Sequence, residues 1–272
     1  MFSLLDNPII QSAALPFVAA LGLGLLMIFL VPRWYSLSMA LSFFPIAFLI
    51  AGFQLLPLNS TRKILVVGLA VTVLVQSFKY FSQRVWRLVV LAILALVSVA
   101  WVLWPIYISG RVTDVQLLLS MVFVASLLIM SDYQRAQSQS LQLSIMVLAG
   151  TVAVTATLGA SALLGQLSGA LSAVLGALLF ISVVTNRSAG AEMMAPPAVL
   201  MAALFSLAAV FYSGLSWYSL VCLTGLSLII LIPVSGNNRW IRLSIQLVAM
   251  LPLVALAIYL AIPVVDESSG YY

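Results

Sequence analysis

The chain has 272 residues, of which 64% are hydrophobic and only 6% are charged, and its net charge is +5. A soluble domain carries about 25% charged residues. The composition therefore excludes a soluble globular protein and predicts an integral membrane protein that uses lipid as its solvent. Basic residues are too scattered for a nucleic-acid-binding surface, so we expect no nucleic-acid partner. The whole chain, residues 1–272, is predicted to be a single membrane domain.

Ten apolar segments follow one another along the chain. A spanning helix needs about 20 apolar residues, and the segments that approach this length are 9–31, 36–58, 64–80, 88–108, 115–130, 141–164, 167–185, 195–212, 216–234 and 241–264. Lipid-exposed strands or loops would leave backbone groups unpaired, so the expected fold is an all-α, polytopic transmembrane helical bundle with about ten spans. The first segment is too long for a signal peptide, and we expect it to be an uncleaved span.

Two of these segment boundaries lie inside long uncharged stretches. Residues 141–185 are about twice the length of one span, and we place the break at 164–166, where Gly165 interrupts the apolar run. Residues 197–234 are also uncharged, and we place their break at 212–214.

Basic residues fall mainly in every second connection between the segments. Eight of the eleven follow this alternation, namely Arg33, Lys79, Arg84, Arg87, Arg135, Arg187, Arg239 and Arg242, and the other three are Arg62, Lys63 and Arg111. The positive-inside rule places the eight in the cytoplasm. Both termini are then extracytoplasmic, and the expected location is the bacterial cytoplasmic (inner) membrane.

The most polar internal stretch, residues 131–140, divides the segments into five and five. We interpret it as a cytoplasmic loop joining two halves, 1–130 and 141–272. Five spans per half would give the halves opposite topology, as in transporters built from inverted repeats.

Residue types limit the chemistry that this chain can perform. It has no histidine and one cysteine, Cys222, so histidine-dependent metal, haem and catalytic sites and iron–sulfur clusters are excluded. The six acidic residues all fall in expected loops or at the termini. We therefore expect no enzyme activity and no cofactor. An enzyme acting on lipid phosphates would need cations and an acid converging at one membrane interface.

Small and hydroxylated residues mark the sixth and seventh segments. Residues four apart share one helix face, and in lipid such faces allow helices to approach closely. We predict helix packing at Gly165, Gly169, Ala173 and Gly176. A hydroxyl-lined substrate path would involve Thr151, Thr155, Ser168 and Ser172. Tight packing alone, or docking of another subunit, would account for the same pattern.

The stretch 79–87 interleaves three cations with three aromatic residues. Lys79, Arg84 and Arg87 are expected to contact lipid headgroups at the membrane surface. An anchor that fixes orientation and a site that recognises a phosphorylated lipid or a partner are both open interpretations.

Two functional hypotheses remain. The first is a carrier or permease for a small neutral or amphipathic solute, including a lipid, with the hydroxyl-bearing helices lining its path. The second is a non-catalytic accessory or scaffold subunit of a larger membrane complex. Expected partners are membrane lipids, and other membrane subunits or a second copy of this chain.

Overall fold

The computed structural model describes residues 7–52, 59–80, 83–159, 161–186, 191–213, 215–229 and 238–262. These residues form ten α-helices: α1 (Leu15–Leu30), α2 (Leu37–Ala51), α3 (Ser60–Gln76), α4 (Arg84–Ile108), α5 (Asp114–Tyr133), α6 (Ser138–Leu158), α7 (Ala162–Val184), α8 (Ala191–Ser213), α9 (Trp217–Ile229) and α10 (Arg239–Ala261). A π-helical turn, η2 (Ile10–Ala14), leads into α1, and short 3-10 turns, among them η5 (Arg135–Gln137), connect other helices. Each segment predicted from the sequence corresponds to one helix, which confirms the all-α class.

Seven of the described helical segments are long and apolar enough to cross a membrane. They comprise η2 with α1, and α4, α5, α6, α7, α8 and α10, while α2 and α9 are shorter apolar helices. Helix α3 has Arg62 and Lys63 in its first turn. The protein is therefore a multi-pass helical membrane protein with about seven candidate spans, and the ten crossings expected from the sequence stay a prediction.

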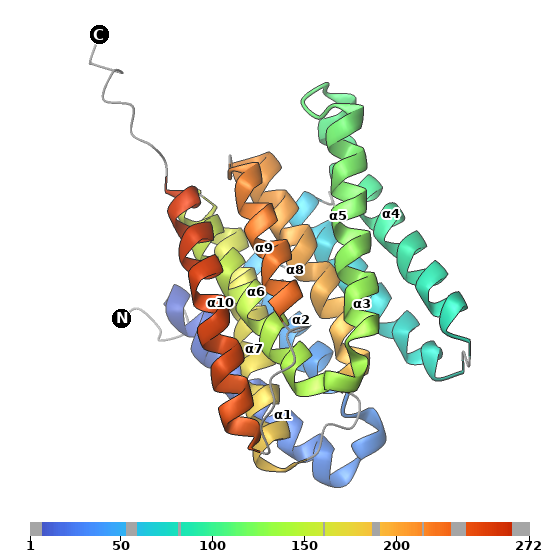
Figure 1. Cartoon of the computed structure of the whole chain (residues 1–272), viewed down its shortest axis with the longest axis vertical. Helices are drawn as coiled ribbons and strands as arrows, with labels where there is room; N and C mark the ends of the chain where they lie inside the picture. Colours follow the sequence, from blue (N-terminus) through green and yellow to red (C-terminus); the bar gives the residue numbers. More distant parts are fainter. Residues whose placement is uncertain are drawn as a thin grey trace.

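Helix α8 forms the centre of the bundle and packs against α3, α5 and α6 (Figure 1). Of the residues in its most apolar stretch, 94% are buried, against 22% for the segments that contain α1 and α10. Along α1 the buried positions recur every fourth residue, at Pro16, Ala20, Gly24 and Ile28. This single buried stripe marks α1 as a peripheral helix, whereas α8 is apolar and covered on all sides.

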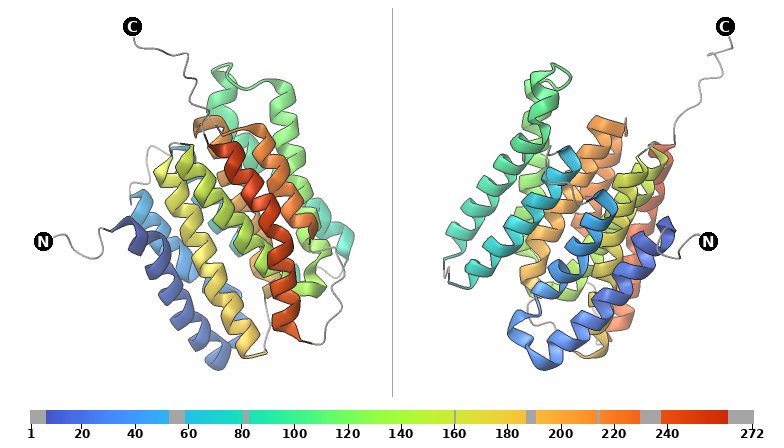
Figure 2. Two further views of the ribbon diagram at one scale, coloured as in Figure 1. Left: turned by 60° about the vertical axis from the view of Figure 1, so that its left-hand side comes forward. Right: turned by 180° about the vertical axis from the view of Figure 1, so that it is seen from behind.

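Helices α1, α7, α6 and α10 lie side by side on one face of the bundle (Figure 2). Consecutive helices run in opposite directions, so the first residues of α2, α4, α6, α8 and α10 gather at one end, the lower end in Figure 1. We call this end the basic end, because the described side chains Arg84, Arg87, Arg135, Arg239 and Arg242 lie in or beside the first turns of these helices.

The break between α6 and α7 differs from the sequence prediction. It falls at 159–161 rather than 164–166. Ser161 caps α7 by accepting a hydrogen bond from the Leu164 amide, 3.4 Å away, and the Gly159 amide donates to Thr155 at the end of α6. Gly165 lies within α7, where its missing side chain serves packing and not a turn. The second predicted break, at 212–214, agrees with the end of α8 at Ser213.

The polar stretch 131–140 was predicted to be a loop and is mostly helical instead. Residues 131–133 complete α5, η5 follows, and residues 138–140 begin α6. Five of its polar side chains are buried: Ser131, Asp132, Gln134, Gln139 and Ser140. Polar groups inside a bundle need partners, and one is Ser182 of α7, whose carbonyl accepts a hydrogen bond from Gln139 Nε2 at 3.2 Å. The stretch is therefore part of the packed end of the bundle.

Candidate functional site

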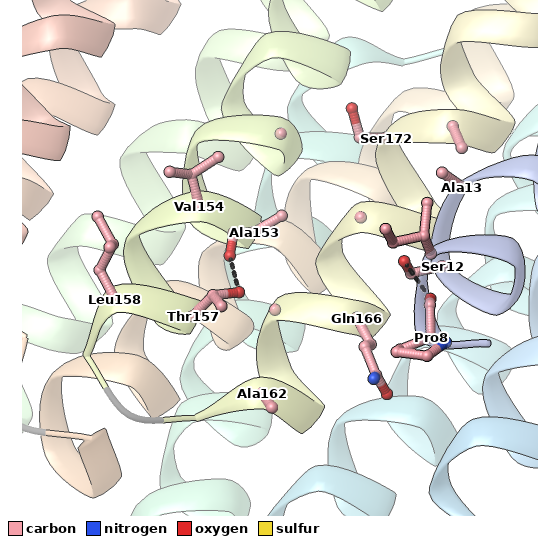
Figure 3. Close-up of a pocket in the computed structure, with 15 residues that line it drawn as sticks. Pro8, Ser12, Ala13, Ala153, Val154, Thr157, Leu158, Ala162, Gln166 and Ser172 are labelled. Carbon is pink, nitrogen blue, oxygen red and sulfur yellow. Dashed lines mark hydrogen bonds between the residues drawn. The ribbon is translucent and has the colours of Figure 1, made fainter. Parts of the chain in front are cut away.

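A groove of about 710 Å³ lies where η2, the second half of α6 and the first half of α7 meet (Figure 3). Its walls are mainly apolar or small residues, and several of them reach the protein surface: Ile9 is 72% exposed, Val154 45% and Leu158 41%. The groove is at the end of the bundle opposite the basic end, since α6 finishes and α7 begins there. A mostly apolar concavity of this size is typical of a site for a small organic ligand.

Close contact between α6 and α7 forms the floor of the groove. A Cβ added at Gly165 would overlap Thr157 Oγ1 and would lie 3.0 Å from the carbonyl oxygen of Ala153. One at Gly150 would lie 3.1 Å from Ser172 Oγ. Missing side chains thus let the two backbones approach, as is common between helices in lipid. On the third side, Ser12 of the π-helical turn lies on the groove wall.

Among the described residues, four uncharged polar side chains reach the groove: Ser12, Thr157, Gln166 and Ser172. Ser12 donates its hydroxyl hydrogen to the Pro8 carbonyl, and Thr157 donates to that of Ala153, both at 2.7 Å (Figure 3). Ser172 donates to the Met146 carbonyl at 2.9 Å. Because each hydroxyl hydrogen is used, these oxygens can only accept from a ligand, whereas the Gln166 amide can donate and accept.

The residues predicted to line a substrate path fall in different places. Ser172 lines the groove. Thr151, Thr155 and Ser168 are buried, and they are not among the residues that line it. Thr151 and Thr155 donate to carbonyls one turn back on α6, and Ser168 Oγ has no hydrogen-bond partner among the described residues.

The residues predicted to pack helices lie along the contact of α7 with its neighbours. Gly165 abuts α6 as described above, and a Cβ at Gly176 would lie 3.2 Å from Met146 Sδ. A Cβ at Gly169 would lie 3.4 Å from the Ser12 carbonyl oxygen and 3.8 Å from Ala153 Cβ. Ala173 lines the groove. Gly165 and Gly169 line it as well, so one stripe of small residues serves both the packing and the groove.

A second polar site lies at the basic end. The Asp132 side chain is fully buried in the last turn of α5 and is surrounded by three arginines. Arg135 Nε is 2.8 Å from Asp132 Oδ1, Arg87 Nε is 3.8 Å from the same oxygen, and Arg84 Nε is 3.8 Å from Oδ2. We call these four residues the arginine cluster. Burial lowers the pKa of the Arg135 guanidinium, and the Asp132 carboxylate opposes that shift.

Sequence reasoning singled out two residues of this cluster, but for a different role. Arg84 and Arg87 were expected to contact headgroups, and the structure directs both at Asp132. The side chain of Lys79, the third predicted contact, lies outside the described residues, as does Arg187. Asp132 was wrongly expected in a loop, because the sequence does not show that three cations compensate its burial.

The described residues contain no group of three or more histidine, cysteine or acidic side chains that could hold a metal ion. No protein-family model matches the chain, and no curated protein or solved structure matches it significantly. Its function therefore has to be inferred from the chemistry of the groove and the arginine cluster.

Proposed function

We propose that this multi-pass membrane protein is a carrier for a neutral amphipathic solute of lipid type, which binds in the groove between η2, α6 and α7. The observation that carries the proposal is the groove itself: about 710 Å³, apolar walls, uncharged polar groups and an opening along exposed side chains. Binding sites for organic ligands usually combine an apolar lining with a few polar groups that fix orientation.

The lining indicates the chemistry of the solute. Among the described residues, no charged side chain lines the groove, so a charged headgroup would gain no counter-ion from them in exchange for its lost hydration. Ser12, Thr157 and Ser172 offer acceptor oxygens, and Gln166 offers both kinds of hydrogen-bonding group. Such a set suits a headgroup with hydroxyl or amide groups, such as a glycerol or a sugar. The apolar walls suit an acyl or isoprenoid chain.

Filling the groove should stop transport. Ala162 and Ala173 both line it, so leucine at either position adds volume in the groove, and Ala162 is exposed, so there the change has little cost to folding. We expect each variant, Ala162→Leu and Ala173→Leu, to slow transbilayer movement of a fluorescent monoglucosyl diacylglycerol to the rate of protein-free vesicles. The measurement is quenching of the outer-leaflet probe by dithionite in reconstituted liposomes.

The matched control is Ala249→Leu, the same change at an exposed position of α10 away from the groove. It should transport like the wild type. Equal rates in all three variants and the wild type, with all proteins folded, would count against the groove as the solute site. The buried Ser168 is a poor position for this test, because leucine there would overpack the interior whether or not a solute binds.

We also propose that the basic end faces the cytoplasm. Arg84, Arg87, Arg135, Arg239 and Arg242 belong to this end among the described side chains, and only Arg62, Lys63 and Arg111 belong to the other. The positive-inside rule favours this orientation. The groove would then lie toward the extracytoplasmic leaflet.

Single cysteines test the orientation in a Cys222→Ser background. Ser109 and Gln137 are exposed and lie at opposite ends, Ser109 between α4 and α5 and Gln137 in η5. A membrane-impermeant maleimide added to intact spheroplasts should label Ser109→Cys. It should label Gln137→Cys only after the membrane has been permeabilised. The reverse pattern would invert the proposed topology.

A second candidate function is that of an accessory subunit, and one observation favours it. Glycines and alanines make up much of the groove lining, among them Gly150, Gly165 and Gly169, and small residues also suit a helix of another protein. Native mass spectrometry of the protein extracted from its own membrane separates the two functions. Stoichiometric foreign subunits would favour the accessory role, and a co-purified lipid would favour the carrier.

A further inference from the structure

The arginine cluster carries more positive charge than its acid requires. Three guanidinium groups lie within 4 Å of one carboxylate, so the cluster has a net charge of about +2. Glu192 also stabilises the charged form of Arg135, but Glu192 is exposed at the start of α8 and still leaves one positive charge in excess. One guanidinium group is enough to balance the charge of one buried carboxylate. Compensation of Asp132 therefore does not account for all three arginines.

The cluster also has hydrogen-bond donors without acceptors. Among the described residues, Arg87 Nε, Arg135 Nε and Arg135 Nη2 are buried and have no hydrogen-bond partner. The two contacts of 3.8 Å are too long for hydrogen bonds, and the 2.8 Å contact of Arg135 Nε is not aligned as one. Both carboxylate oxygens of Asp132 likewise lack a hydrogen-bond partner among the described residues, so the acid attracts the guanidinium groups by charge without pairing with these three N–H groups. Buried donors without acceptors are costly, and in native proteins they call for an explanation.

We propose that Arg84, Arg87 and Arg135 form a binding site for a phosphate group, with Asp132 as the residue that positions them. A phosphate ester brings the negative charge that the cluster lacks. Its oxygens can accept several N–H bonds at once, and planar guanidinium groups match this geometry better than other cations do. The exposed fraction of the three side chains decreases from the surface inward: the Arg84 side chain is 48% exposed, that of Arg87 22% and that of Arg135 12%.

The surroundings of the cluster match the depth of lipid headgroups. Trp86 and Tyr133 are 59% and 69% exposed and flank it on α4 and α5, and Val85 beside them is 68% exposed. Arg84 stacks over the Tyr133 ring, with the guanidinium carbon 4.2 Å from the ring centre. Exposed aromatic residues at helix ends favour the membrane interface. The phosphate can belong to an anionic lipid of that leaflet or to a soluble phosphorylated compound, and the experiment distinguishes these sources.

The test measures binding of dioctanoyl phosphatidic acid to the full-length protein in an uncharged detergent by isothermal titration calorimetry. Arg84→Gln and Arg135→Gln should each weaken binding about tenfold, the loss expected for one charged hydrogen-bonding partner. Arg135→Gln could also disturb folding, because it removes the contact nearest to Asp132. Arg84→Gln keeps the test independent of folding, since that side chain is half exposed and 3.8 Å from the acid.

The matched control is Arg239→Gln, the same loss of charge at the same end of the protein but on α10. It should bind like the wild type, and any binding of dioctanoyl glycerol, which lacks the phosphate, should be the same in Arg84→Gln as in the wild type. Equal weakening by Arg239→Gln would indicate general charge attraction and overturn the proposed site. Unchanged affinity in Arg84→Gln and in a folded Arg135→Gln would overturn it as well.

Competition by inorganic phosphate identifies the source. Displacement of the short-chain lipid at millimolar phosphate would support a phosphate site open to soluble compounds. If the lipid stays bound at that phosphate concentration, and Arg84→Gln and Arg135→Gln each lose about tenfold in lipid affinity, the result would support the same site with a lipid as its ligand. Neither outcome depends on transport through the groove, so this site and the proposed carrier function can fail separately.

Discussion

Replacing Asp132 with asparagine should destabilise the protein by about 3 kcal/mol. Asparagine has nearly the same size, so the change removes only the negative charge that three arginines share. Breaking a buried ion pair on one side typically costs about 3–5 kcal/mol, because the remaining charge is left uncompensated. We expect the lower end of this range, since half of the Arg84 side chain reaches solvent. Denaturant unfolding in an uncharged detergent, free of anionic lipid, measures the change without a bound anion that would mask it.

Asp114→Asn is the matched control on the same helix. Asp114 begins α5 and is exposed, and it accepts a hydrogen bond from the Tyr107 hydroxyl at 2.8 Å. Removing a negative charge from an exposed helix N-terminus should lower the free energy of unfolding by less than about 1 kcal/mol. If Asp132→Asn were no more harmful than Asp114→Asn, Asp132 would not hold the cluster together.

A double variant separates charge balance from packing. Asp132→Asn combined with Arg135→Gln removes one negative and one positive charge, so the remaining arginines repel each other less. We expect the double variant to be more stable than the sum of the two single losses predicts, by about 1–3 kcal/mol, as for residues in direct contact. Strict additivity would contradict the electrostatic account.

The sequence was sufficient for the helices because the signal for them is local. Apolar runs, the polar segments between them and the alternation of basic residues each depend on neighbouring positions. The break between α6 and α7 was misplaced because Gly165 was interpreted as a turn residue. In the structure the turn ends at Ser161, whose side chain caps α7, and Gly165 is needed one turn later for its contact with Thr157. The sequence alone does not separate these two uses of glycine.

The arginine cluster depends on contacts between distant parts of the chain, yet one signal for it was present. Residues 109–113 form a short connection, so α4 and α5 must pair as a hairpin. The start of α4 then lies beside the end of α5, which brings Arg84 and Arg87 to Asp132 and Arg135. Residues three apart share a helix face. Aligning α4 and α5 as an antiparallel pair could therefore have predicted that these four residues lie close together. The degree of burial of Asp132 could not be predicted in this way.

The predicted substrate path and the groove overlap only in part, for a different reason. Small and hydroxylated residues singled out α6 and α7, which both line the groove, and of the predicted path residues Ser172 lines it. Spacing of four residues shows which side chains share a face, but not which face a neighbouring helix covers. Ser168 and Thr155 face the interior and are fully buried, while η2, which no pattern linked to α7, supplies the third wall.

Gly165→Ala should destabilise the protein by about 2 kcal/mol, because the new methyl group has no space. Its Cβ would overlap Thr157 Oγ1 and lie 3.0 Å from the Ala153 carbonyl oxygen, which is backbone and cannot move alone. Overpacking a tight contact typically costs about 1–3 kcal/mol. The loss outweighs the gain in helix propensity from glycine to alanine, about 1 kcal/mol at most. Thermal unfolding in detergent micelles measures the difference.

Two further variants show whether the cost comes from the crossing of α6 and α7. A Cβ at Gly22, on α1, would meet nothing within 4 Å, so Gly22→Ala should be neutral or slightly stabilising. Thr157→Ala removes the overlapping oxygen, so Gly165→Ala combined with Thr157→Ala should recover part of the lost stability. The carbonyl of Ala153 remains in place, so the recovery should be incomplete. A Gly165→Ala variant as stable as Gly22→Ala would mean that α6 and α7 can separate freely, and the floor of the groove would then not be a rigid contact.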